Sequence, residues 1–207
     1  MTATTATPLI VRIGFLIRNG VRSLRSSSLT LARISELFGT VPKSYFFESF
    51  NANEFAEKTG FEVTFVQDNE SKSRYGVLRG MHFQLPPYTQ SKLVRVVKGK
   101  VLDVVVDVRK GSPTYGKYEV CELTEENHRQ FFVPKGMAHG FVVLSEDAVF
   151  QYKCDEFYHP EAEGAIAWDD PVLNIKWPIP VADVILSEKD KHHPRLNDFE
   201  SPFVFNL

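Results

Sequence analysis

The chain has 207 residues, a formal net charge of -2 and 43% hydrophobic residues. This length is enough for one domain with a substantial core, and the near-neutral charge gives no general attraction to nucleic acid or to a membrane. The longest apolar runs fall short of a membrane span. Cys121 and Cys154 are far apart and belong to no metal-binding or redox motif. We therefore expect a soluble, cytoplasmic protein with reduced cysteines.

Residues 1–44 differ in composition from the rest of the chain. Five arginines occur among many Ser and Thr residues, and no acidic residue precedes Glu36. This composition is typical of an organelle transit peptide. The alternative is an irregular N-terminal extension in which residues 9–17 pair as an edge strand. We separate this segment from a domain that covers residues 45–207.

The first part of this domain predicts a strand, a short helix and a second strand. Residues 45–50 are rich in aromatic side chains, which indicates the first strand. Asn51 can cap a helix that buries Phe55, and Gly60 can end that helix in a left-handed conformation. Residues 61–67 alternate apolar and polar side chains, as a half-buried strand does.

Residues 77–84 (VLRGMHFQ) place a guanidinium, an imidazole and a carboxamide along one extended run. Polar groups stand where a core strand would carry apolar ones, so we expect this strand to line a pocket. Regular strand alternation would point Arg79 and His82 to opposite faces. A β-bulge at Gly80 would bring both side chains into one pocket.

The following residues predict a mainly β structure. Residues 92–97 and 101–108 indicate a hairpin around residues 98–99, in which Asp103 and Asp107 lie on the polar face of a one-sided sheet. Further strands are expected at residues 118–123, 130–133, 141–144 and 148–154. Such closely spaced strands, with Gly/Pro turns between them, indicate a β-sandwich or barrel. We expect the chain beyond Cys154 to lie irregularly across the domain.

Residues 134–140 (PKGMAHG) fit the second cupin motif, P-x-G-x-x-H, in which a turn delivers His139 into a small barrel. Metal-dependent cupins also need an H-x-H sequence and an acid as ligands. His82 is followed by Phe83 and Gln84, so that ligand set is missing. A barrel without a metal is therefore expected, and a metal-dependent cupin oxygenase is the alternative.

From about residue 45 to residue 190, the sequence resembles the dTDP-4-dehydrorhamnose 3,5-epimerase family. The matching stretches are FFESF at 46–50, VQDN at 66–69, VLRGMHFQ at 77–84, KLVR at 92–95, PKGMAHGF at 134–141, QYK at 151–153 and LSEKD at 186–190. The resemblance implies an all-β, cupin-like jelly-roll barrel with short peripheral helices. It also implies a homodimer that needs no cofactor and acts on a dTDP-linked 4-keto-6-deoxy sugar.

The implied reaction is epimerisation at C3 and C5 of dTDP-4-dehydro-6-deoxy-D-glucose to dTDP-4-dehydro-L-rhamnose. The 4-keto group acidifies both C–H bonds, so a base can remove a proton from one face while a donor returns one to the other. The resemblance implies that His82 is the base, Asp190 its partner and Tyr152 the acid. It places Lys92 near the keto oxygen, where a cation stabilises an enolate.

The resemblance also implies a set of substrate-binding residues: Arg79, His139, Gln67, Asn69, Glu48, Tyr158, Glu163 and Lys189. Lys43 stands where the family has an arginine that binds phosphate, and an ammonium cannot reproduce the guanidinium fork. A catalytically impaired cupin that binds sugar nucleotides is therefore an alternative, and a mono-epimerase is another. We expect Asp169 and Asp170 to be structural, and residues 192–193 to be a solvated histidine pair.

Overall fold

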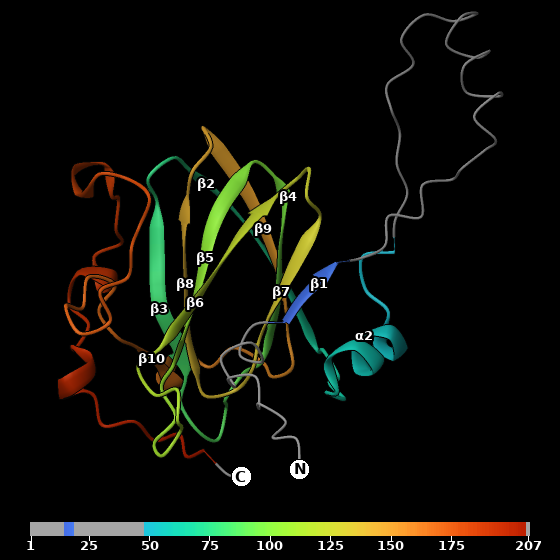
Figure 1. Ribbon diagram of the computed structural model, residues 1–207, viewed down its shortest axis with the longest axis horizontal. Coiled ribbons are helices and arrows are strands. Elements are labelled where there is room, and N and C mark those ends of the chain that lie inside the picture. Colours follow the sequence, from blue (N-terminus) through green and yellow to red (C-terminus); the bar gives the residue numbers. More distant parts are fainter. Residues whose placement is uncertain (1–14, 19–47, 206–207) are drawn as a thin grey trace, which may run out of the picture.

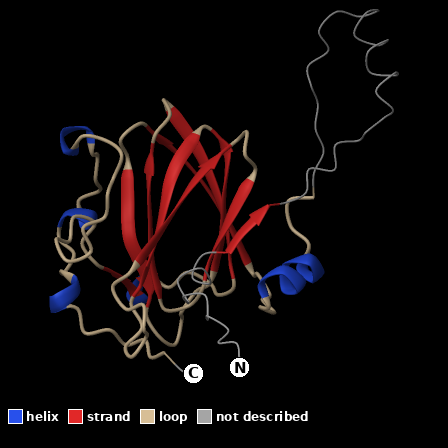
Figure 2. Cartoon of the chain, in the orientation of Figure 1, coloured by secondary structure: helices blue, strands red, loops and turns tan. Residues whose placement is uncertain are grey.

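The structure is a computed structural model that describes residues 15–18 and 48–205 (Figure 1). Its framework is two five-stranded sheets, ordered β1-β7-β4-β9-β2 and β10-β3-β8-β5-β6, in which neighbouring strands pair antiparallel. The strands dominate the described chain (Figure 2), which confirms the all-β prediction.

The strands are β1 (Phe15–Arg18), β2 (Gln67–Arg74), β3 (Leu78–Gln84), β4 (Lys92–Lys98), β5 (Lys100–Asp107), β6 (Tyr118–Thr124), β7 (Arg129–Val133), β8 (Met137–Val143), β9 (Asp147–Cys154) and β10 (Glu163–Ala165). The helices are α2 (Ala52–Thr59) and the short 3-10 helices η2 (Pro160–Ala162), η3 (Val181–Asp183), η4 (Lys189–Lys191) and η5 (Leu196–Asp198). β1 is an edge strand paired with β7, which agrees in part with the strand expected within residues 9–17. The rest of the predicted extension, residues 1–14 and 19–44, lies outside the described residues.

Helix α2 begins and ends where the sequence predicts. The Asn51 side chain accepts hydrogen bonds from the backbone N–H groups of Asn53 and Glu54. Gly60 ends the helix in the left-handed conformation, with a φ of 74°. Phe55 is buried and packs edge-on against Phe132, so the helix rests on strand β7.

The two strands expected beside this helix are wrong in the described residues. Residues 48–50 are not part of a strand, and residues 61–66 are irregular. The strand β2 starts only at Gln67 and continues through a polar sequence to Arg74. Its half-buried side chains alternate with exposed ones, but the half-buried ones are polar because several of them face a cavity. Apolar alternation therefore predicts this strand several residues too early.

The predicted hairpin between β4 and β5 is also wrong, although both strands exist. β4 pairs with β7 and β9, whereas β5 pairs with β6 and β8 in the other sheet. The chain passes between the sheets at Gly99, where φ is 77° and a Cβ would lie 2.1 Å from the Asp147 carbonyl oxygen. Alternation along a strand indicates which residues share a face, and it does not identify the strand's partners.

Strand β5 is buried on both faces, which corrects the expected one-sided sheet. Val105 packs in the core between the sheets, and Val104 packs on the opposite side against Ile166 and Phe203. The C-terminal segment thus covers the outer face of this sheet, as its expected course across the domain implies (Figure 1). Asp103 and Asp107 lie on the inner face of β5, on the same side as Val105, and are fully buried.

The tail is fixed by the Asp169–Asp170 pair, which has the structural role expected from the sequence. Asp170 is buried and accepts hydrogen bonds from the backbone N–H groups of Val172, Leu173 and Leu196. Asp169 forms an ion pair with Arg195 at 2.7 Å. Within the described residues, no helix is long and apolar enough to cross a membrane.

Candidate active site

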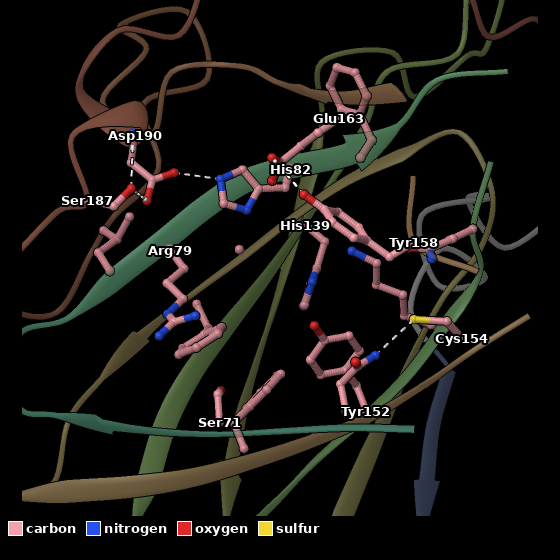
Figure 3. Close-up of a pocket in the computed structure, with 18 of the residues that line it drawn as sticks. Ser71, Arg79, His82, His139, Tyr152, Cys154, Tyr158, Glu163, Ser187 and Asp190 are labelled. Atoms are coloured by element: carbon pink, nitrogen blue, oxygen red, sulfur yellow. Dashed lines mark hydrogen bonds and ion pairs between the residues drawn. The ribbon is translucent and has the colours of Figure 1, made fainter. Parts of the chain in front are cut away.

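A cavity of about 630 Å³ lies between the two sheets. One wall comes from strands β3 and β8, the other from β2, β4 and β9, and residues 185–190 of the tail close one side. Figure 3 shows the lining side chains converging on this space. Most of the polar residues singled out in the sequence line it: Arg79, His82, Lys92, His139, Tyr152, Asp190, Gln67, Asn69, Tyr158, Glu163 and Lys189.

A β-bulge in β3 brings Arg79 and His82 to the same cavity. Arg79 is opposite Phe141 and His82 is opposite His139, so β3 has one more residue than β8 between these pairs. Gly80 has a φ of 141°, and a Cβ there would lie 2.6 Å from the Gly140 Cα. The predicted bulge is thereby confirmed, because a regular ladder would have separated the two side chains.

His82 forms a pair with Asp190, which comes from the tail. The His82 Nε2 lies 2.5 Å from the Asp190 Oδ1, and the Ser187 hydroxyl donates to Oδ2 at 2.7 Å. Burial would raise the pKa of Asp190, but the hydrogen bonds from His82 and Ser187 hold it well below its usual range. The carboxylate therefore stays ionised and can stabilise a proton on His82.

Tyr152 lies across the cavity from His82 (Figure 3). It belongs to β9, in register with Asn69 and Val94, and packs against the Phe150 ring. Burial raises the pKa of the Tyr152 phenol, which keeps the group protonated near neutral pH. An imidazole that can accept a proton thus faces a phenol that can donate one across the cavity.

Lys92 lines the same wall as Tyr152. Its Nζ lies 5.9 Å from the centre of the Tyr152 ring, so a positive charge stands next to the proposed donor. Burial lowers the pKa of Lys92, while Cys154, Asp103 and Glu163 act in the opposite direction. The alternative of an exposed edge lysine does not hold, because the ammonium points into the cavity region.

A second imidazole–carboxylate pair lies deeper in the cavity wall. The His139 Nε2 is 2.9 Å and 3.0 Å from the two oxygens of Asp103, and the carboxylate is fully buried. Burial raises the pKa of Asp103, and the neighbouring His139 and Lys92 oppose this effect. Sequence reasoning missed Asp103, although a single acid within the apolar run VLDVVV was a usable signal.

The rim of the cavity is connected by hydrogen bonds between predicted binding residues. The Tyr158 hydroxyl donates to Glu163 at 3.2 Å, and the Lys189 ammonium contacts both Glu163 oxygens at 2.6 Å and 2.9 Å. The Gln67 side chain accepts from the Tyr158 backbone N–H and donates to Asn69 Oδ1. These contacts connect the polar side chains at the rim of the cavity.

Two predicted binding residues do not join this cavity in the described chain. Glu48 is exposed beside the start of α2, where its carboxylate accepts from the Asn51 amide at 3.3 Å. Lys43 lies outside the described residues.

Besides Asp103, the sequence did not indicate that His193 and Cys154 belong to the site. The expected solvated pair at residues 192–193 is wrong for His193, whose Nε2 lies 3.3 Å from Asp190 Oδ1 because the turn at η4 brings it back. Cys154 lines the cavity as a free, buried cysteine, and burial raises its pKa to about 11. Among the described residues, His82, Asp190 and His193 have ligand atoms close enough to hold a metal ion.

The chain matches a family model described as dTDP-4-dehydrorhamnose 3,5-epimerase over residues 40–198. A protein of this name from Methanothermobacter thermautotrophicus is 51% identical over 160 residues, which cover 77% of this chain and 85% of that protein. Another, from Shigella flexneri, is 53% identical over 72% of this chain and 81% of its own length.

Solved structures show the same similarity. A dTDP-4-dehydrorhamnose 3,5-epimerase from Elizabethkingia anophelis is 53% identical, with a TM-score of 0.73, over 77% of this chain and 87% of that one. An epimerase from Legionella pneumophila in complex with dTDP-4-keto-L-rhamnose is 46% identical, with a TM-score of 0.77, over 81% and 89%. A 3'-monoepimerase from Streptomyces bikiniensis is 33% identical, with a TM-score of 0.71, over 77% and 80%. The predicted cupin-like jelly roll is thereby confirmed.

Proposed function

Because the chain belongs to the dTDP-4-dehydrorhamnose 3,5-epimerase family, we propose that it converts dTDP-4-dehydro-6-deoxy-D-glucose to dTDP-4-dehydro-L-rhamnose. The observation that carries this proposal is the His82–Asp190 pair facing Tyr152 across one cavity. Inversion at carbon requires a base and an acid on opposite faces of the sugar ring, and this cavity offers both.

In the proposed mechanism, His82 removes the proton from a carbon next to the 4-keto group. The C–H electron pair forms the enolate, and Asp190 stabilises the resulting imidazolium. The Lys92 ammonium stabilises the enolate oxygen more strongly than the neutral ketone, which lowers the barrier. Tyr152 then gives its proton to the opposite face of the same carbon. Proton exchange with solvent then restores His82 and Tyr152 to their starting states, and the same two proton transfers take place at the second carbon.

Substrate binding is assigned to the rest of the cavity. Arg79 is exposed at its edge and can form a forked interaction with diphosphate oxygens, while His139 contacts the sugar. Gln67 and Asn69 can satisfy donors and acceptors of the thymine base. Tyr158, Glu163 and Lys189 complete the rim, and a role for Lys43 in phosphate binding remains a prediction.

We also propose that the protein is a cytoplasmic homodimer that needs no cofactor. Glu48 is a predicted binding residue, yet it lies outside the cavity of its own chain, as a residue that serves a partner's site would. Cys121 and Cys154 are buried and unpaired, which suits a reducing compartment. Light scattering coupled to size-exclusion chromatography tests the dimer, which a monomer mass would contradict.

Incubation with dTDP-4-dehydro-6-deoxy-D-glucose in D2O tests the activity. We expect deuterium at both C3 and C5, together with formation of the L-rhamno product, as followed by NMR. Deuterium at one carbon alone would identify a mono-epimerase. Calorimetric binding of the substrate without exchange would identify the impaired binding protein, and Lys43→Arg would then test whether phosphate anchoring is the defect.

A further inference from the structure

His193 shares a carboxylate oxygen with the proposed catalytic base. The Asp190 Oδ1 lies 2.5 Å from the His82 Nε2 and 3.3 Å from the His193 Nε2. The two imidazole rings meet edge to face, with their centres 5.7 Å apart. Two ring nitrogens and one carboxylate oxygen therefore converge on a single point at the cavity wall, and all three lie within 4.8 Å of one another.

This set of donors is the set that Zn²⁺ and similar divalent ions prefer. Zinc sites with an open position commonly use three ligands from His and Asp or Glu, at about 2.0–2.2 Å from the ion. Tetrahedral coordination at this range separates two ligand atoms by about 3.3 Å, which the His193–Asp190 distance already matches. The His82–Asp190 distance has to widen by less than about 1 Å, which a small rotation of either side chain supplies.

The surroundings favour a cation at this point. The Asp190 carboxylate is fixed by the Ser187 hydroxyl and by its own backbone turn, so one ligand is already ordered. The Glu163 carboxylate lies close enough to act electrostatically on both His82 and His193, and the Lys189 ammonium is engaged with Glu163 rather than with the histidines. The His82 and His193 side chains are 21% and 18% exposed, so both rings are accessible to an ion from solvent.

We propose that His82, Asp190 and His193 form an inhibitory binding site for Zn²⁺ or a similar divalent transition-metal ion. The ion occupies the His82 Nε2 and the Asp190 oxygen that otherwise contact each other. Asp190 then no longer stabilises a proton on His82, and the metal-bound imidazole is a weaker base at Nδ1. The inhibitory consequence rests on the proposed function, whereas binding of the ion depends only on the three side chains. The ion is a regulator of the site in this proposal and plays no part in turnover.

Binding is tested on the full-length chain without an affinity tag, with Co²⁺ as a spectroscopic substitute for Zn²⁺. We expect visible d–d absorption typical of tetrahedral Co²⁺, saturating at one ion per chain and lost on addition of Zn²⁺. His193→Asn should weaken this binding by more than about tenfold, since even indirect contacts to a metal site are commonly worth 10–100-fold. His192→Asn is the matched control, because the exposed neighbouring imidazole is outside the cluster.

The two measurements separate failure of this proposal from failure of the proposed function. Binding that is equal in wild type, His193→Asn and His192→Asn would overturn the site, as would no saturable binding at all. Inhibition is then measured as the Zn²⁺ concentration that halves deuterium exchange, and we expect His193→Asn to raise it by more than about tenfold. If the wild type shows no exchange but binds Co²⁺ through His193, the metal site stands and the epimerase assignment fails.

Discussion

The two imidazole–carboxylate pairs of the cavity contain the same chemical groups in opposite electrostatic settings. His82 and His139 are cross-strand partners on β3 and β8, and each contacts an aspartate. Asp190 receives an additional hydroxyl hydrogen bond, and its pKa lies well below the usual range. Asp103 is fully buried between strands, and burial raises its pKa.

This difference indicates that the environment of the carboxylate sets what each histidine can do. An aspartate that stays ionised stabilises a positive imidazolium, so His82 is suited to take a proton and hold it. An aspartate in a dry site bears a full charge less readily, so Asp103 is better suited to orienting His139 toward a ligand. The chemical pair alone would not distinguish a base from a binding residue.

The largest expected effect comes from breaking the first pair. We expect His82→Asn to lower kcat by about 10⁴-fold, the upper range for loss of a general base, and to abolish deuterium exchange in D2O. The matched variant His139→Asn should reduce kcat much less and raise KM, because His139 is assigned to binding. Retained exchange in His82→Asn, with loss of exchange in His139→Asn, would reverse the assignment of the two pairs.

The next largest effect is expected from removing the proposed acid, Tyr152, on the wall opposite the proposed base, His82. Tyr152→Phe removes the proposed donor with little change in shape, and we expect kcat for product formation to fall by about 10²-fold. Because His82 can still remove a proton and return it to the same face, deuterium should enter the substrate without inversion. NMR distinguishes labelled substrate from product, and parallel loss of exchange and inversion would contradict a separate role for Tyr152.

A smaller effect follows from disturbing the bulge that aligns the two histidines. Gly80→Ala places a Cβ against the Gly140 backbone at a φ of 141°, so we expect it to lower the free energy of unfolding by about 1–3 kcal/mol. Gly60→Ala is a control with positive φ and open space around the new methyl group. Denaturant unfolding measures both, and equal losses would show that the close approach to β8 is unimportant.

The smallest expected effect is on the pH dependence of stability, to which Asp190 and Asp103 should contribute with opposite signs. The pKa of Asp190 is lowered in the folded chain, so its stabilising effect is present above the free value of about 3.9 and is lost as pH falls. The pKa of Asp103 is raised, so its ionisation destabilises the fold as pH rises.

Thermal unfolding at about pH 6 and about pH 3 tests this contrast. As pH falls, the wild type should lose stability relative to Asp190→Asn and gain stability relative to Asp103→Asn. The expected change is about 1.4 kcal/mol for each pH unit, between the folded and free pKa values, that the measurement crosses. Shifts of the same sign in both comparisons would contradict the assigned environments.

Local sequence patterns were sufficient for much of the fold. The caps of α2 at Asn51 and Gly60 follow from residue chemistry that acts over a few positions. The bulge at Gly80 was predicted because regular alternation would point Arg79 and His82 to opposite faces of the strand. The register shift between these two residues confirms it. Local patterns indicated that residues 77–84 and His139 face a cavity, and the resemblance to a family supplied the other cavity residues.

Errors occurred where contacts are distant in sequence. β4 and β5 alternate correctly but belong to different sheets, which depends on the whole topology. Asp103 was placed on an exposed face because the second sheet, which covers that face of β5, cannot be read from β5 itself. His193 was taken as solvated because its burial depends on the packing of the η4 turn against His82 of β3.

The position of Asp190 has a consequence for the order in which the proposed site is assembled. β2 pairs with β9 across more than seventy residues, so the walls of the cavity depend on strand pairings that form slowly. The carboxylate that contacts His82 comes from a separate segment, whose neighbouring residues pack on the outer face of the β3 sheet. The proposed base therefore lacks its partner until this segment has docked, and activity on sugar nucleotides would report that docking.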